Sequence, residues 1–98
     1  MLKKDPILTA FGNNLRTRRK EKSLSQERLG ERADLDATYI SGIETGRRNP
    51  GIRNVVLLAK ALGIDPSEFF IGLWLRSEVE TPNKSKNPYL PLSRNHDN

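Results

Sequence analysis

Hydrophobic residues recur along this chain at the spacing of short helices that each bury one face. In the first stretch, expected to form a helix over about residues 7–22, four hydrophobic residues lie at i, i+1, i+4 and i+8 and so share one side. Two shorter patterns follow within residues 25–46 and join across Asp34-Leu35-Asp36. Their spacing suits two helices that lean on one core. The inward positions of these three helices are Ile7, Leu8, Phe11, Leu15, Leu29, Ala33, Leu35, Ile40 and Ile43.

Polar residues and glycines mark the expected helix ends. Ser25 and Asp36 suit the N-caps of the second and third helices, because their side chains can accept free backbone N–H groups. Gly46 and Gly63 suit the left-handed conformation that ends a helix.

Two further helices are expected after residue 50. The fourth covers about residues 53–62, with Ile52 leading into its inward face, and has no obvious N-cap. The fifth begins with Asp65-Pro66-Ser67-Glu68, which combines a capping carboxylate, a proline at the first helical position and a glutamate three residues after the cap. It is expected to run to about residues 77–79.

The predicted fold is therefore all-α, a compact five-helix domain followed by a flexible C-terminal tail. We expect a flexible N-terminus over residues 1–6, one domain over residues 7–79 and a disordered tail over residues 80–98. The tail is rich in Asn, Lys, Ser and Pro, and such a segment cannot bury enough hydrophobic surface to offset the entropy of ordering.

Length and composition limit the possible classes of protein. Ninety-eight residues form one small domain, for which dimerisation would add stability. The absence of cysteine excludes disulfides and thiolate sites and fits a reducing cytoplasm, where we expect this protein. Neither a signal peptide nor a membrane-spanning segment is expected, since the longest hydrophobic run, residues 69–75, is far shorter than the roughly 20 residues of a span.

Positive charge is concentrated near the end of the first helix. The formal net charge is +5, and the cations of this cluster have only Glu21 as an acidic neighbour. Such a cluster suits either a polyanionic partner or a solvated surface. Its members are Arg16, Arg18, Arg19, Lys20 and Lys22.

The motif in residues 25–46, S-Q-E-x-L-x-x-x-A-x-L-x-x-x-Y-I-S-x-I-E-x-G, resembles the helix-turn-helix of the Cro and lambda-repressor family. Residues 38–44 followed by Arg47-Arg48-Asn49-Pro50 are most similar to controller proteins of restriction-modification systems. The resemblance extends from near Phe11 to near Phe70. It implies a dimeric, sequence-specific regulator that binds a double-stranded DNA operator at its own and neighbouring promoters.

The resemblance also implies a set of residues that contact DNA. The third helix would enter the major groove, with its first two residues reaching bases, while Gln26 and the residues after that helix contact phosphates. Some relatives carry side chains at positions 37 and 42 that contact bases, whereas this chain has alanine and glycine there. Recognition of the DNA sequence would then depend on the other residues of the set and on DNA shape. The set is Gln26, Ala37, Thr38, Tyr39, Ser41, Gly42, Thr45, Arg47 and Arg48.

Three further groups have counterparts in the family. Arg19 and Glu44 match a partly buried ion pair, and a buried glutamate requires such a partner. Glu27 and Glu31 match positions that touch the sigma subunit of RNA polymerase in activating members, although they equally suit helix-dipole and solubility roles. The expected dimer interface lies around the fifth helix and comprises Ile64, Phe69, Phe70, Leu73 and Trp74.

Other functions remain open at this point. A phage-type repressor shares the motif, and an antitoxin would use the tail over residues 81–98 to grip a toxin. An enzyme is not expected, because the sole histidine, His96, lies in the tail. The sequence also has no glycine-rich phosphate loop and no metal-ligand spacing, so neither a cofactor nor a metal is expected.

Overall fold

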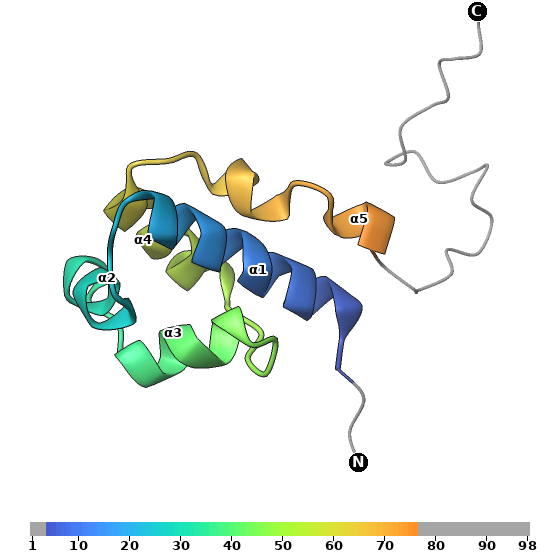
Figure 1. The fold of residues 1–98 in the computed structure, drawn as a ribbon, viewed down its shortest axis with the longest axis horizontal. Coiled ribbons are helices and arrows are strands. Elements are labelled where there is room, and N and C mark those ends of the chain that lie inside the picture. Colours follow the sequence, from blue (N-terminus) through green and yellow to red (C-terminus); the bar gives the residue numbers. More distant parts are fainter. Residues whose placement is uncertain (1–3, 77–98) are drawn as a thin grey trace, which may run out of the picture.

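A computed structural model describes residues 4–76, and the predictions for the tail and its histidine lie outside that part. Within it the chain forms helices and no strand. Figure 1 shows α1 through the middle, with α2 and α3 on one side, α4 behind it and the last elements on the other side. The elements are α1 (Pro6–Glu21), α2 (Gln26–Ala33), α3 (Ala37–Glu44), α4 (Ile52–Leu62), the 3₁₀ helix η1 (Pro66–Phe70) and α5 (Leu73–Arg76).

The predicted helix caps are confirmed. The Ser25 hydroxyl accepts the backbone N–H of residue 28 at 3.0 Å, and the Asp36 carboxylate accepts that of residue 38 at 2.7 Å. Helix α1 begins at Pro6, one residue earlier than expected, because Asp5 caps it by accepting the N–H groups of residues 7 and 8. Proline suits this first position, where no helical N–H bond is needed.

The hydrophobic core lies between α1 and the helices around it. Burying a large hydrophobic side chain completely contributes about 1.5–3 kcal/mol, and the core contains six with less than 2 % exposure. Ile52, expected to lead into the inward face of α4, is instead 81 % exposed at the first position of that helix. The six fully buried side chains are Leu15, Leu29, Ile40, Ile43, Leu58 and Phe69.

Helices α1 and α3 cross with their backbones in contact. A Cβ atom added at Gly12 would overlap the carbonyl oxygen of Ile43 and would lie 2.6 Å from that of Glu44. Only a residue without a side chain permits this approach. The contact places the C-terminal end of α3 directly against α1 and leaves the opposite face of α3 outward.

The predicted fifth helix is divided in two. It begins at Asp65 as expected, but after η1 the backbone is extended at Ile71 and left-handed at Gly72, with φ +79°. The side-chain amide of Asn14 in α1 donates to the carbonyls of Phe69 and Ile71, at 2.8 and 2.9 Å. These bonds satisfy carbonyl groups that a continuous helix would have used internally.

No helix in the described part of the chain is both long enough and hydrophobic enough to cross a membrane.

Candidate nucleic-acid interface

A tight turn connects α2 to α3. Asp34 adopts the left-handed conformation, with φ 59°, and its backbone N–H bonds to the carbonyl of Gly30. The next N–H, that of Leu35, bonds to the same carbonyl at 2.9 Å. Aspartate tolerates this conformation better than most residues. Ile40 and Ile43 hold the other side of α3 in the core.

The outward side of α3 forms one hollow with the loop that follows it. Its volume is about 640 Å³, and both arginines of the loop are exposed there. Five of the six residues that line it belong to the set predicted to contact DNA, and the sixth is the α3 cap. They are Asp36, Thr38, Tyr39, Gly42, Arg47 and Arg48.

Arg48 is held against the surface of α3. Its guanidinium lies over the Tyr39 ring, 5.3 Å from the ring centroid, within the range of a cation–π interaction. Its backbone N–H, like that of Arg47, donates to the carbonyl of Gly42, at 3.1 and 2.8 Å respectively. The Asn54 side-chain amide in α4 donates to the Tyr39 hydroxyl at 3.0 Å. Asn54 lies outside the motif of residues 25–46, so nothing in the sequence marks it as a member of this site.

Arg19 and Glu44 form an ion pair between α1 and α3, with only 8 % and 5 % of each residue exposed. The Arg19 Nε and Nη2 atoms lie 2.7 and 2.9 Å from the two carboxylate oxygens, and Nη1 donates to the carbonyl of Leu24 at 2.7 Å. The hydrogen bond to Glu44 raises the pKa of the Arg19 guanidinium above its ordinary value, although burial opposes the shift. The guanidinium therefore stays charged.

Gln26 is joined to this ion pair. Its side-chain Nε2 atom donates to Glu44 Oε1 at 3.0 Å, and the residue is half-buried at the start of α2. One side-chain N–H and the amide oxygen remain for other partners. The buried carboxylate thus orients a residue that was predicted to contact a phosphate.

The remaining predicted DNA contacts have different surroundings. Thr38 is exposed and Ser41 is half-buried on α3. The Thr45 hydroxyl lies 3.0 and 3.2 Å from the carbonyl oxygens of Ser41 and Gly42, so its proton is directed back at its own helix. Ala37 is half-buried and lines a second hollow.

That second hollow is acidic. Glu27 and Glu31 line it, and both are exposed on α2. Arg28 Nη1 lies 3.2 Å from Glu31 Oε1, but both side chains are about two-thirds exposed. This ion pair therefore contributes little to stability. The hollow also contains Asp34 and Asp36 and has a volume of about 460 Å³.

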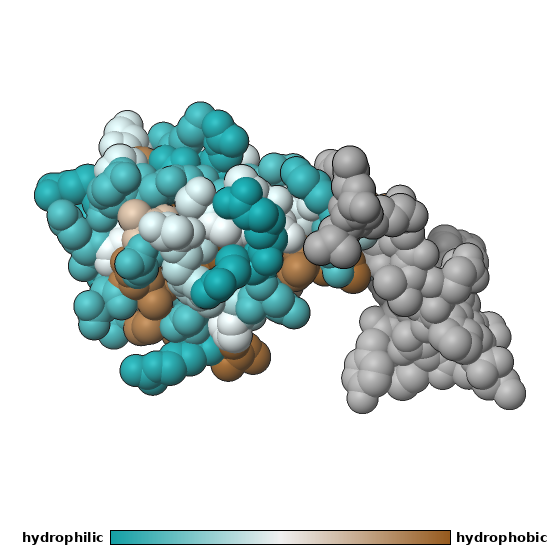
Figure 2. Space-filling view, turned by 90° about the horizontal axis from the view of Figure 1, so that it is seen from below, coloured by the Kyte–Doolittle hydropathy of each residue, from teal (hydrophilic) through white to brown (hydrophobic). Residues whose placement is uncertain are grey.

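The end of the described chain presents hydrophobic side chains to solvent. Phe70, Ile71, Trp74 and Leu75 are between 48 and 69 % exposed, and we call these four residues the apolar end. Hydrophilic residues cover most of the face seen in Figure 2, with hydrophobic areas between them and beside the end of the described chain. A patch of this kind is typical of an interaction surface.

Two residues expected in the dimer interface belong instead to the core. Phe69 is fully buried and Leu73 nearly so, while Ile64 is half-buried against the core. Within η1, Phe69 faces the core and Phe70 faces outward. Phe70 and Trp74 remain available to a partner.

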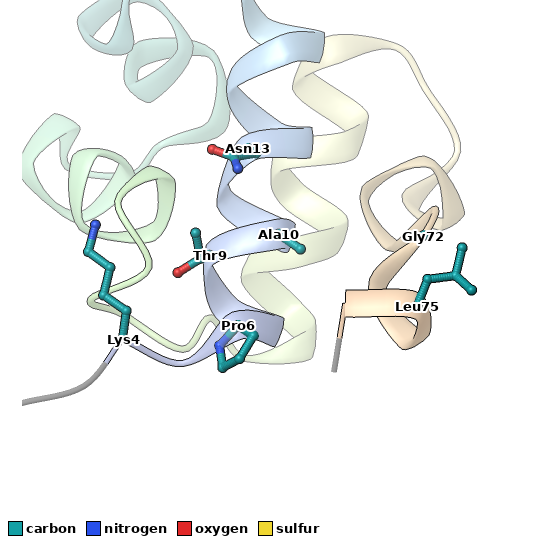
Figure 3. Close-up of a pocket in the computed structure, with 7 residues that line it drawn as sticks. All are labelled: Lys4, Pro6, Thr9, Ala10, Asn13, Gly72 and Leu75. Carbon is teal, nitrogen blue, oxygen red and sulfur yellow. The ribbon is translucent and has the colours of Figure 1, made fainter. Parts of the chain in front are cut away.

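A further hollow of about 630 Å³ separates the first half of α1 from α5 (Figure 3). Lys4, Thr9 and Asn13 line one side, and Gly72 and Leu75 line the other. Among the residues of the lining that the structure describes, Lys4 alone carries a charge. No cluster of metal-ligating side chains occurs in the described residues.

Comparison with known proteins identifies the family. The helix-turn-helix family matches residues 15–69, more than half of the chain. Control protein C.MunI of Mycoplasma sp is 49 % identical over 65 residues, which cover 65 % of this chain and 88 % of that protein. Control protein C.BamHI of Bacillus amyloliquefaciens is 46 % identical over 63 residues, covering 63 % and 78 %.

Solved structures agree with this assignment. The restriction-modification controller protein C.AhdI from Aeromonas hydrophila is 46 % identical, with a TM-score of 0.64, over 64 % of this chain and 96 % of that one. The arrangement of α2 and α3 and the sequence matches lead to the same conclusion. The chain belongs to the helix-turn-helix family of transcriptional regulators, among the restriction-modification controller proteins.

Proposed function

We propose that the outward face of α3 and the loop after it bind a double-stranded DNA operator, with α3 in the major groove. The observation that carries this proposal is the hollow in which five predicted contact residues meet, with Arg47 and Arg48 both exposed. The major groove, about 12 Å wide, admits one helix with side chains directed at base edges.

The chemistry of each residue suggests its part in binding. Thr38 and Ser41 carry hydroxyl groups that can donate to or accept from base edges, while Ala37 offers only a methyl group. Arg47 and the remaining Gln26 N–H suit phosphate oxygens, as do the backbone N–H groups at the start of α2. Few of these side chains can make strong contacts with base edges, so DNA shape carries part of the specificity.

The apolar end supports a symmetric dimer. A two-fold interface pairs the same surface on both chains, and Phe70 and Trp74 supply exposed aromatic side chains of the kind enriched in interfaces. Such a dimer would place two α3 helices about 34 Å apart, one turn of DNA. Its operator would be a pair of inverted half-sites. This role places the protein in the cytoplasm, with the DNA.

A contact with the polymerase sigma subunit is the finer part of the proposal. The exposed carboxylates of Glu27 and Glu31 beside α3 favour a basic partner. The variant Glu27→Lys/Glu31→Lys should lose activation of a reporter promoter yet keep operator binding. Glu21→Lys, an exposed reversal on α1, is the control. Unchanged activation in the double variant would remove this contact.

A salt titration tests DNA binding itself. We expect affinity for duplex DNA to fall by about a thousandfold or more between roughly 50 and 200 mM salt if six or more phosphates are contacted. Arg47→Ala should lower the slope of log affinity against log salt by about one for each chain bound. Lys60→Ala, exposed on α4, should leave it unchanged. A flat response in the wild-type protein would refute the proposal.

A further inference from the structure

Two residues beside the proposed DNA-binding surface act on side chains that would contact DNA. Gly42 lies under the Arg48 side chain, and Asn54 reaches from α4 to the Tyr39 hydroxyl. Between them Arg48 and Tyr39 stack on each other. The four residues therefore form one connected unit, drawn from α3, the loop after it and α4.

Gly42 provides the space in which Arg48 lies. A Cβ atom at position 42 would overlap Arg48 Cγ and would lie 3.5 Å from Arg48 Cβ and Cδ, and these are the three nearest atoms outside the helix itself. A side chain here would therefore displace Arg48. Gly42 lies inside α3, where glycine is a poor helix former compared with alanine, so local stability does not explain its presence.

Asn54 fixes the other half of the unit. Its side-chain amide donates to the Tyr39 hydroxyl across 15 positions of sequence. Tyr39 is half-buried and packs against the core, so this bond defines which way its ring faces. The ring in turn supplies the surface on which the Arg48 guanidinium rests.

We propose that Gly42 and Asn54 are positioning residues that hold Arg48 and Tyr39 in a preformed arrangement for DNA. The inference rests on the proposed function and adds to it residues that need not touch DNA. An arginine that is already ordered loses less side-chain entropy on binding, and its planar guanidinium is presented at one angle. Gly42 then contributes to DNA binding by leaving space for the Arg48 side chain, although it has no side chain of its own to contact DNA.

The test measures affinity and thermal stability together. The probe is a labelled duplex enriched from a random pool by the wild-type protein, with a scrambled duplex for comparison. Gly42→Ala should weaken binding by up to about tenfold, the cost of ordering one long side chain on binding. Its melting temperature should be equal to or above that of the wild type, because alanine favours the helix. A residue with only a structural role would lower both quantities.

A double-mutant cycle makes the inference specific. In an Arg48→Ala background, Gly42→Ala should have no further effect on affinity, since the side chain that it displaces is gone. Wild-type affinity in Gly42→Ala, or additive losses in the double variant, would overturn the proposal. Failure of the wild-type protein to enrich any duplex would instead refute the proposed function.

Asn54 supplies an independent cycle if Gly42→Ala does not fold. Asn54→Ala and Tyr39→Phe each remove one partner of the same hydrogen bond. Each should weaken binding a few-fold, and the double variant should bind no more weakly than the weaker single one. Independent, additive losses would show that the Tyr39 hydroxyl acts without Asn54, and this arm of the proposal would fall.

Discussion

Replacing Arg19 by methionine should destabilise the domain strongly. Arg19 makes two hydrogen bonds to the Glu44 carboxylate and a third to the carbonyl of Leu24, all at 2.7–2.9 Å. Methionine keeps much of the volume but leaves a buried carboxylate without its counter-charge. Removing one partner of a buried ion pair costs about 3–5 kcal/mol.

The structure places the expected cost near the lower end of that range. The Gln26 side chain still donates to one Glu44 oxygen, so the carboxylate keeps one neutral partner. We therefore expect a loss of about 3 kcal/mol, a large part of the roughly 5–15 kcal/mol of a typical domain. For a domain of this size the melting temperature should fall by about 12–24 °C.

Thermal and urea unfolding followed by far-ultraviolet circular dichroism would measure this effect. Arg16→Met, an exposed arginine on the same helix, is the matched control and should change stability by less than about 0.5 kcal/mol. Adding Glu44→Gln to Arg19→Met removes the stranded charge and should restore part of the loss. A shift in melting temperature of less than about 4 °C for Arg19→Met would refute the reasoning.

The same pair predicts how this stabilisation depends on pH. Because the Arg19 pKa is raised in the folded protein, mainly by its hydrogen bond to Glu44, the contribution is complete below the ordinary arginine pKa. It is lost only as the pH rises through the higher folded value. The difference between wild type and Arg19→Met should therefore be constant from neutral pH to about pH 10.

Three other variants test separate features. Gly12→Ala, which would force α1 and α3 apart, should cost at least about 1–3 kcal/mol in urea unfolding, whereas Gly51→Ser, in open space at the start of α4, should cost nothing. The hydrogen bond from the backbone N–H of residue 67 lowers the pKa of Asp65 in the folded protein. The wild type should therefore melt at a higher temperature than Asp65→Asn above about pH 4, and this advantage should vanish as the pH falls through the lower folded pKa. An advantage that does not depend on pH would contradict this. Trp74→Glu should remain folded but sediment as a monomer, and a persistent dimer would exclude the apolar end as the interface.

The features that could be predicted from sequence are local ones. The caps at Ser25 and Asp36 and the inward positions of the first three helices follow from residues close together in the chain. The break at Gly72 does not, because the amide that stabilises it comes from Asn14, 57 positions away from Ile71. The sequence also could not show which of two adjacent phenylalanines faces inward, since that depends on how η1 packs against α1 and α4.

For the candidate site, the sequence indicates the residues but not the contacts between them. Its residues were found through the resemblance, and the structure places most of them around one hollow. Their connections were not predictable: Asn54 lies on another helix, and the close packing of Gly42 with Arg48 depends on the path of the loop. From sequence alone Gly42 is simply a position without a base-contacting side chain, because packing over a glycine leaves no signal in the composition.

The backbone contact at Gly12 has a consequence for how such a protein can change. The angle of α3 is set by main-chain contact with α1 and by inward residues, and these are separate from the outward positions 37, 38 and 41. Substitutions at those positions can therefore be made without moving the helix that carries them. New operator preferences can then evolve, or be selected from a library, on an unchanged scaffold.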